Sequence, residues 1–161
     1  MIELQLEDPA WREAMADVEA VVARAAAAVL TDTAASDGEP LATVLLEDDD
    51  AVRALNARFR DRDAPTNVLS FPANAVPGTP DADPYLGDII LAFGVCRREA
   101  DEQGKPLAHH LSHLVIHGLL HLMGHDHQDD AEAEVMEARE RTLLAGLGIE
   151  DPYRAILDRD P

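Results

Sequence analysis

The sequence predicts one domain, residues 1–161, of the α/β (α+β) class, with about four strands and about five helices. Segments with the period of a strand and segments with the spacing of a helix follow one another along the chain, and this alternation indicates the class. A length of 161 residues suits a single domain with a sizeable core. A composition of 47% hydrophobic and 28% charged residues is typical of a globular protein.

The first half of the chain is predicted to hold two strands and two helices. Apolar and polar residues alternate over residues 2–6, which indicates a half-buried strand. Asp8-Pro9 then opens a helix that continues to about residue 30, because aspartate suits the N-cap and proline the first helical position. A second strand covers residues 41–47, and the acidic triplet 48–50 caps a helix that runs to about residue 59.

The second half is predicted to add two strands and three helices. A short apolar strand within the segment 55–72 is separated from a largely buried strand over residues 86–92 by a loop rich in proline and glycine. The three helices are residues 95–103, the histidine-rich segment that Gly104 and Pro106 introduce, and a last helix from Asp129-Asp130 to about 146–148. We expect the tail at 151–154 to be pinned against the body.

The chain is strongly acidic. Its formal net charge of −19 favours solubility and works against broad attraction to nucleic acid, so any RNA binding needs a local basic patch. The single cysteine, Cys96, excludes an intrachain disulfide and a multi-cysteine zinc site, and it fits a small buried residue in a reducing cytoplasm. The first residues given lack the basic region and apolar core of a signal peptide, and the most apolar long stretch is too short to span a bilayer, so we expect a soluble cytoplasmic protein.

Residues 117–127 have the form H-x-x-x-H-x-x-G-x-x-H, which is typical of a metal site. His117 and His121 are four residues apart, so on a helix both imidazoles lie on one face and can reach one ion. Gly124 stands where the helix must end for the chain to turn back, and His127 can then approach the ion. Three imidazoles with one open position describe a catalytic zinc site that is suited to hydrolysis.

Other histidines keep the ligand set open. His109, His113, His117 and His121 form a row at four-residue spacing, so the pair alone is weak evidence. His113 and His125 remain rival ligands, whereas His109 and His110 are interpreted as surface residues or partners of ligands. The spacing is zincin-like, but Gly118 occupies the position at which metzincin proteases carry their general base, and this argues against peptide hydrolysis.

The densest positive cluster of the chain is Arg58, Arg60 and Arg62, helped by Arg53. A well-placed arginine can hold a phosphodiester beside a metal, because its contacts with phosphate are charge-assisted and often bidentate. On charge alone, a solvated helix end whose arginines pair with Asp61 and Asp63 is the favoured interpretation. Asp88, within the predicted strand 86–92, either orients a ligand histidine or is a strand-end residue satisfied by backbone donors, with equal weight.

Three segments in this order, 55–72, 86–89 and 117–127, together with Asp151-Pro152-Tyr153, make the chain resemble the YbeY family of bacterial endoribonucleases and rRNA maturation factors. The resemblance covers nearly the whole chain. It implies one small mixed β-sheet packed with helices and one Zn²⁺ per chain on His117, His121 and His127. It also implies single-strand-specific cleavage of RNA in 3′-end maturation of small-subunit rRNA, with a role in ribosome quality control.

The resemblance also bears on individual residues. The arginine of the family's Phe/Tyr-Arg motif matches Arg60, which makes Arg60 the favoured catalytic candidate. Further contacts with the ligands or the substrate are expected from Ser70, Asp88, His113 and His125, although the family usually has tyrosine where His125 stands. The expected partners are single-stranded rRNA and proteins of the ribosome or its small subunit, with no membrane association.

Several points stay open at the level of sequence. The general base is not identifiable, the attacking group is either water or the RNA 2′-hydroxyl, and another divalent metal such as nickel can replace zinc. A non-catalytic ribosome-assembly factor stabilised by its metal is the alternative function. A zinc peptidase is a weaker one, because it needs a base where Gly118 stands.

Overall fold

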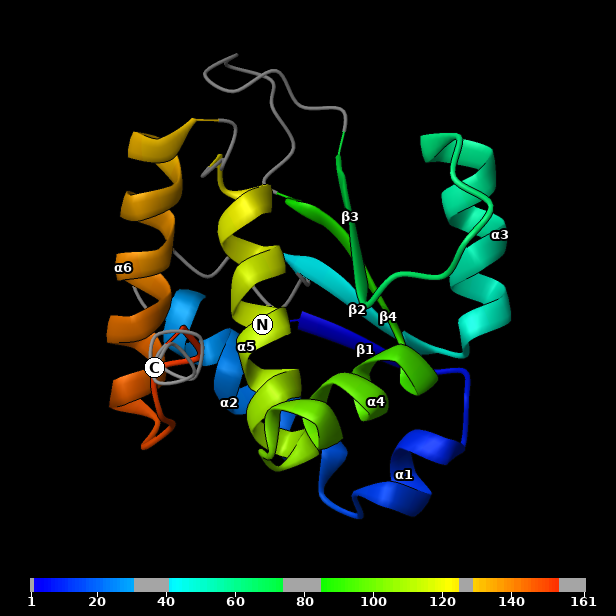
Figure 1. Ribbon diagram of the computed structural model, residues 1–161, viewed down its shortest axis with the longest axis horizontal. Coiled ribbons are helices and arrows are strands. Elements are labelled where there is room, and N and C mark those ends of the chain that lie inside the picture. Colours follow the sequence, from blue (N-terminus) through cyan, green and yellow to red (C-terminus); the bar gives the residue numbers. More distant parts are fainter. Residues whose placement is uncertain (1, 31–40, 74–84, 125–128, 154–161) are drawn as a thin grey trace.

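The computed structural model describes residues 2–30, 41–73, 85–124 and 129–153 (Figure 1). Within these residues the chain forms four strands and six helices. The strands are β1 (Ile2–Leu6), β2 (Ala42–Glu47), β3 (Val68–Pro72) and β4 (Gly87–Ala92). The helices are α1 (Ala10–Ala14), α2 (Val18–Leu30), α3 (Asp49–Arg60), α4 (Phe93–Gln103), α5 (Leu107–Leu122) and α6 (Asp130–Gly146).

The four strands form one mixed sheet in the order β1-β2-β4-β3. β1 pairs with β2 and β2 pairs with β4 in parallel, whereas β3 pairs antiparallel with β4 at one edge. The predicted α/β class and the single mixed sheet are therefore confirmed.

Helices cover both faces of this sheet (Figure 1). α2, α5 and α6 lie on one side and α3 lies on the other. Alternate residues of β4 enter two cores: Ile89 and Leu91 join a large cluster with residues of α2 and α5, whereas Ile90 joins a smaller cluster with Val52 of α3. Because β4 is buried on both faces, it holds α5 and α3 in fixed positions on either side of the sheet.

The helix predicted from residue 9 to residue 30 is interrupted. α1 ends at Ala14, Met15 is extended with φ −148° and ψ 96°, and α2 begins at Val18. Trp11 gives the reason, since its indole is fully buried, donates to the carbonyl of Glu47 at 3.0 Å and meets the ring of Phe93 edge-on. This anchor ties α1 to the end of β2, so the chain has to change direction before α2 can run along the sheet.

Two predicted helix caps are present. The side chain of Asp48 accepts a hydrogen bond from the backbone N–H of Ala51 at 2.8 Å. The side chain of Asp129 accepts one from the backbone N–H of Glu132, also at 2.8 Å. Each satisfies one donor that the first turn of a helix leaves without a partner, which explains why α3 and α6 begin where the acids stand. No helix in the described ranges is long and apolar enough to cross a membrane.

Candidate metal centre

The histidine helix α5 lies very close to the sheet at Gly118. A Cβ atom placed there would come within 3.0–3.2 Å of side-chain atoms of Ile89 on β4. The residue next to His117 therefore faces the sheet and has no room for a larger side chain. This packing explains why no acid stands at the position where metzincins carry their general base.

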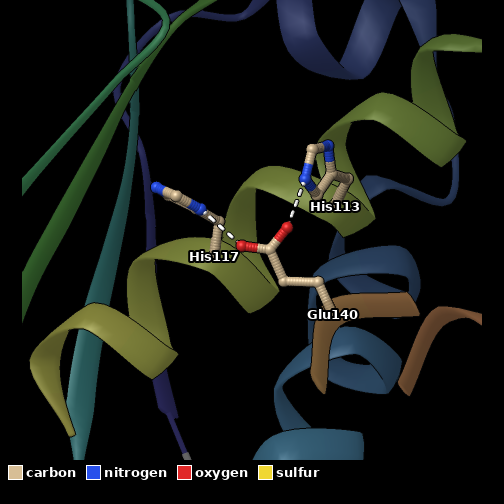
Figure 2. A group of neighbouring side chains, drawn as sticks. All are labelled: His113, His117 and Glu140. Atoms are coloured by element: carbon tan, nitrogen blue, oxygen red, sulfur yellow. Dashed lines mark hydrogen bonds and ion pairs between the residues drawn. The ribbon is translucent and has the colours of Figure 1, made fainter. Parts of the chain in front are cut away.

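His117 is held by a carboxylate from another helix (Figure 2). Glu140 of α6 is fully buried; its Oε1 atom lies 2.6 Å from Nδ1 of His117, and its Oε2 atom lies 2.9 Å from Nε2 of His113. The second nitrogen of the His117 ring points away from Glu140. A carboxylate on one imidazole nitrogen, with the other nitrogen directed elsewhere, is the usual arrangement around a metal-binding histidine.

Tyr153, the last of the described residues, completes the surroundings of Glu140. Its hydroxyl donates to Oε2 of Glu140, and its ring meets the ring of His113 edge-on with centroids 5.6 Å apart. Burial raises the pKa of Glu140, but the hydrogen bonds from His113, His117 and Tyr153 outweigh burial and lower that pKa to about 2. Burial and the Glu140 charge raise the pKa of Tyr153, so its hydroxyl keeps its proton.

These charge states assign the protons. An ionised carboxylate only accepts hydrogen bonds, so Nδ1 of His117 and Nε2 of His113 both carry protons and donate to Glu140. His117 is thereby fixed in the tautomer whose Nε2 can bind a metal. The hydrogen bond from His113 to Glu140 uses the Nε2 atom of this rival ligand.

Donor atoms of His113, His117 and Glu140 all lie within 4.8 Å of one another, so this group could hold a metal ion. The individual distances favour a different role for Glu140. Two ligands of a tetrahedral zinc ion, each about 2.0–2.1 Å from it, lie about 3.3 Å apart. The contacts of 2.6 and 2.9 Å are shorter and match charge-assisted hydrogen bonds. Glu140 thus fits the role of orienting His117 toward an ion.

His121 follows His117 by one turn on α5 and is half-buried. The predicted ligand His127 and the rival His125 lie outside the described residues, as does the end of the predicted metal motif. A cavity of about 330 Å³ opens beside His117. It is lined by His117, Ala133, Met136, Glu137, Glu140 and Tyr153. The site is therefore accessible from the side of α6.

Arg60, the last residue of α3, reaches the edge strand β3. One of its terminal nitrogens donates to the carbonyl of Ser70 at 2.8 Å, and its guanidinium lies 5.4 Å from the centre of the Phe71 ring. Ser70 pairs with Ile89, the residue against which Gly118 packs. β3 and β4 thus connect Arg60 on one face of the sheet with the histidine helix on the other. The expected arginine–aspartate pairing is seen for Arg53, whose Nε lies 2.8 Å from Asp63.

Asp88 lies on the other face of the sheet from α5. Its neighbours in β4, Gly87 and Ile89, alternate with it, and Ile89 faces the core that α5 covers. A carboxylate oxygen of Asp88 accepts from the hydroxyl of Tyr85 at 2.5 Å. Glu140 is a carboxylate that does contact a predicted ligand, His117.

Glu140 and Tyr153 are the residues of this site that the sequence reasoning missed. A signal for Glu140 was present, because Met136, Glu140 and Leu144 form the buried stripe of α6 at four-residue spacing. An acid at a core position of an amphipathic helix needs buried partners. Tyr153 has no comparable signal in a burial pattern, since its position follows from the turn after α6, although Asp151-Pro152-Tyr153 forms part of the family resemblance.

Comparison with known proteins agrees with this architecture. The family model described as "Endoribonuclease YbeY" matches residues 5–148. Relatives of that name include one from Rhodopseudomonas palustris (strain BisB5), 55% identical over 147 residues that cover 88% of this chain and 75% of the relative. Another, from Paramagnetospirillum magneticum, is 52% identical over 155 residues and covers 94% of both chains. The solution structure of TM1509 from Thermotoga maritima has the same fold, with a TM-score of 0.59 at 23% identity and 92% coverage of both chains.

Proposed function

The chain belongs to the YbeY endoribonuclease family, and from this premise we propose that it is a zinc-dependent endoribonuclease that cleaves single-stranded RNA. The observation that carries the proposal is the buried contact between Glu140 and Nδ1 of His117. A buried carboxylate that accepts a hydrogen bond from one histidine of an H-x-x-x-H-x-x-G-x-x-H segment is an arrangement typical of metal binding.

In this proposal His117, His121 and His127 hold one zinc ion per chain. Their donor set fits zinc, which binds imidazole nitrogens and keeps an open position at catalytic sites. When bound, the metal supplies a water of lowered pKa and polarises a phosphoryl oxygen. Nickel or another divalent metal is an alternative occupant of the same ligands. Glu140 keeps His117 in the required tautomer, and the cavity beside His117 gives the substrate access.

Arg60 is proposed to bind the scissile phosphate and to stabilise the charge that develops on it. The guanidinium has five N–H donors, so a bond to the Ser70 carbonyl leaves others for a phosphate. The cation–π contact with Phe71 restrains the guanidinium before substrate arrives. Ser70, on the strand beside the histidine helix, and His125 are further candidates for contact with the ligands or the RNA.

The proposed substrate is ribosomal RNA of the small subunit, at its 3′ end, with a further role in ribosome quality control in the cytoplasm. The names of the relatives support RNA cleavage. The net charge of −19 gives weak general attraction to RNA, so a ribosomal protein is proposed to help bring the enzyme to its site.

The same charge favours one alternative, a non-catalytic ribosome-assembly factor whose metal only stabilises the fold. A zinc peptidase is less well supported, because Gly118 packs on the sheet where the base would be needed.

Metal analysis of protein purified without a histidine tag tests the proposal. We expect about one zinc ion per chain, lost in His117→Ala and kept in His109→Ala. His109 is a suitable control, because it belongs to the same helix and lines a different cavity at its start. Metal-loaded protein should cleave single-stranded RNA and leave duplex RNA intact, and 2′,3′-cyclic phosphate ends would show attack by the 2′-hydroxyl. A folded protein that binds no divalent metal contradicts the proposal.

A further inference from the structure

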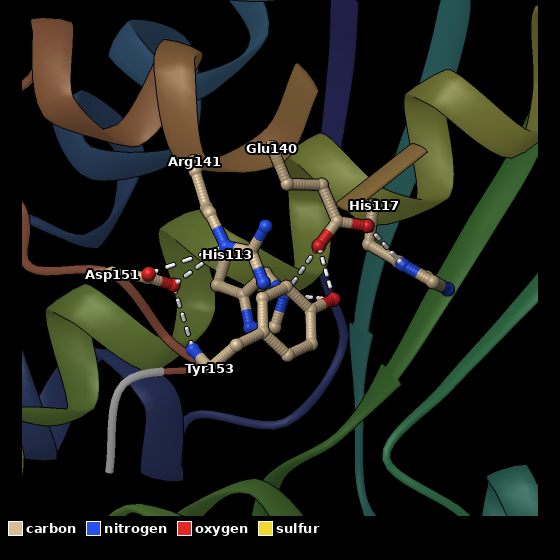
Figure 3. Close-up of polar contacts among 6 residues, drawn as sticks. All are labelled: His113, His117, Glu140, Arg141, Asp151 and Tyr153. Carbon is tan, nitrogen blue, oxygen red and sulfur yellow. Dashed lines mark hydrogen bonds and ion pairs between the residues drawn. The ribbon is translucent and has the colours of Figure 1, made fainter. Parts of the chain in front are cut away.

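The chain after α6 folds back onto the metal centre (Figure 3). Gly148 adopts a left-handed conformation with φ 76°, and the backbone N–H of Ile149 donates to the carbonyl of Leu144 at 2.9 Å. These contacts end the helix and reverse the chain, as left-handed glycines commonly do. The reversal brings Asp151 and Tyr153 alongside α6 and α5.

Asp151 anchors the returning segment. The Nε atom of Arg141 lies 3.2 Å from both carboxylate oxygens of Asp151, and one of these oxygens accepts from the backbone N–H of Tyr153 at 2.9 Å. The guanidinium of Arg141 also lies 5.2 Å from the centre of the Tyr153 ring. The ring is thus held from its backbone and from one face, so its hydroxyl has a defined position.

That hydroxyl meets Glu140, the carboxylate whose other oxygen contacts His117. Oε2 of Glu140 receives the Tyr153 hydroxyl and Nε2 of His113, whereas Oε1 receives Nδ1 of His117. With donors on both oxygens, the carboxylate cannot rotate about its last torsion without losing at least one of them. Figure 3 shows the chain of contacts from Arg141 and Asp151 through Tyr153 and Glu140 to His117.

We propose that Tyr153 is a positioning residue of the metal centre, which fixes Glu140 so that His117 presents Nε2 to the ion. This inference rests on the proposed function. It assigns the segment after α6 a role in positioning Glu140 and His117 for metal binding. Partners bonded directly to a ligand histidine typically change metal affinity about 10- to 100-fold. Tyr153 acts one bond further away, so we expect an effect of about 3- to 10-fold.

The test is Tyr153→Phe, which removes the hydroxyl and keeps the ring that lines the cavity. Tyr85→Phe is the matched control, because Tyr85 also donates to a carboxylate, Asp88, on the other face of the sheet. Zinc affinity is measured by competition with a chelator. The tautomer of His117 is read in zinc-free protein from long-range ¹H–¹⁵N correlations, a readout that a purely structural role for Tyr153 would leave unchanged.

We expect Tyr153→Phe to weaken zinc binding about 3- to 10-fold and to add the Nε2–H tautomer of His117, with Tyr85→Phe like the wild type. If Tyr153→Phe does not fold, Asp151→Asn gives the same test with the hydroxyl retained, since it weakens the anchor of the ring. If the wild-type protein binds zinc and cleaves RNA, and these variants keep its zinc affinity and its His117 tautomer, the inference is overturned. The proposed function is then left intact. A wild-type protein that binds no metal overturns both.

Discussion

Oε1 of Glu140 lies 2.6 Å from Nδ1 of His117, although 23 positions separate the two residues in the sequence. The contact joins α6 to α5 inside the protein, where an ionised carboxylate is costly unless it is fully hydrogen-bonded. Three donors surround Glu140 and lower its pKa to about 2 despite burial, so the charge is retained. We therefore expect metal affinity and the packing of α6 to depend on the same side chain.

Replacement of Glu140 by glutamine should weaken zinc binding about 10- to 100-fold. The amide has nearly the same shape, but its NH₂ group must face either the donor of His117 or the two donors of His113 and Tyr153. At least one hydrogen bond is therefore replaced by two donors that face each other. Chelator competition measures the affinity, and thermal unfolding of the zinc-free protein measures the loss of stability.

Glu137→Gln is the control for this change, because Glu137 lines the same cavity one turn earlier on α6. It should keep wild-type zinc affinity. Equal losses in both variants would mean that general negative charge near the cavity, rather than the hydrogen bond to His117, sets the affinity.

Gly118→Ala should destabilise the protein by about 1–3 kcal/mol, because an added Cβ must displace the buried side chain of Ile89. Gly146→Ala is the matched control, since a Cβ there meets no atom within 4 Å in the described structure. That change should be neutral or stabilise by up to about 1 kcal/mol. Denaturant unfolding measures both. Equal stability of the two variants would show that α5 can move away from the sheet.

Cys96 should be inert to thiol reagents in the native protein. Its side chain is fully buried, and burial raises the pKa of its thiol, so the reactive thiolate is scarce. As the chain contains one cysteine, labelling by an aromatic disulfide reports this site alone. We expect labelling at the rate of protein opening, with a steep increase in denaturant. Complete labelling on mixing with native protein would contradict the packing around α4.

Much of the fold was predictable because its signals are local. Alternation in β1 and the capping acids Asp48 and Asp129 depend on neighbours within a few positions, and the structure has these elements. The break between α1 and α2 was not predictable, since it follows from the burial of Trp11 against the distant Glu47 and Phe93.

The site likewise combines features that have a local sequence signal with features that depend on tertiary packing. Helical spacing puts His117 and His121 on consecutive turns of one helix, and the structure has both on α5. The partner of His117 depends instead on how α6 crosses α5, which no local pattern specifies. The sequence offers Asp88 as a candidate for that partner, but the register of β4 turns it toward Tyr85 on the far side of the sheet. The assignment of His127 and of Arg60 stays a prediction.

Arg60→Ala should reduce cleavage of single-stranded RNA about 100- to 1000-fold and leave the zinc content unchanged, because it removes charge stabilisation without touching a metal ligand. Arg60→Lys should restore only part of the rate, since an ammonium cannot make the bidentate contact. Arg53→Ala is the control from the same helix: its ion pair with Asp63 is exposed and contributes little to stability.

Initial rates on a labelled oligonucleotide, with RNA binding measured in parallel, separate two roles for Arg60. Loss of cleavage with binding retained supports a catalytic arginine. If Arg60→Ala loses RNA binding and the wild-type protein shows no cleavage with any metal, the assembly factor is favoured instead.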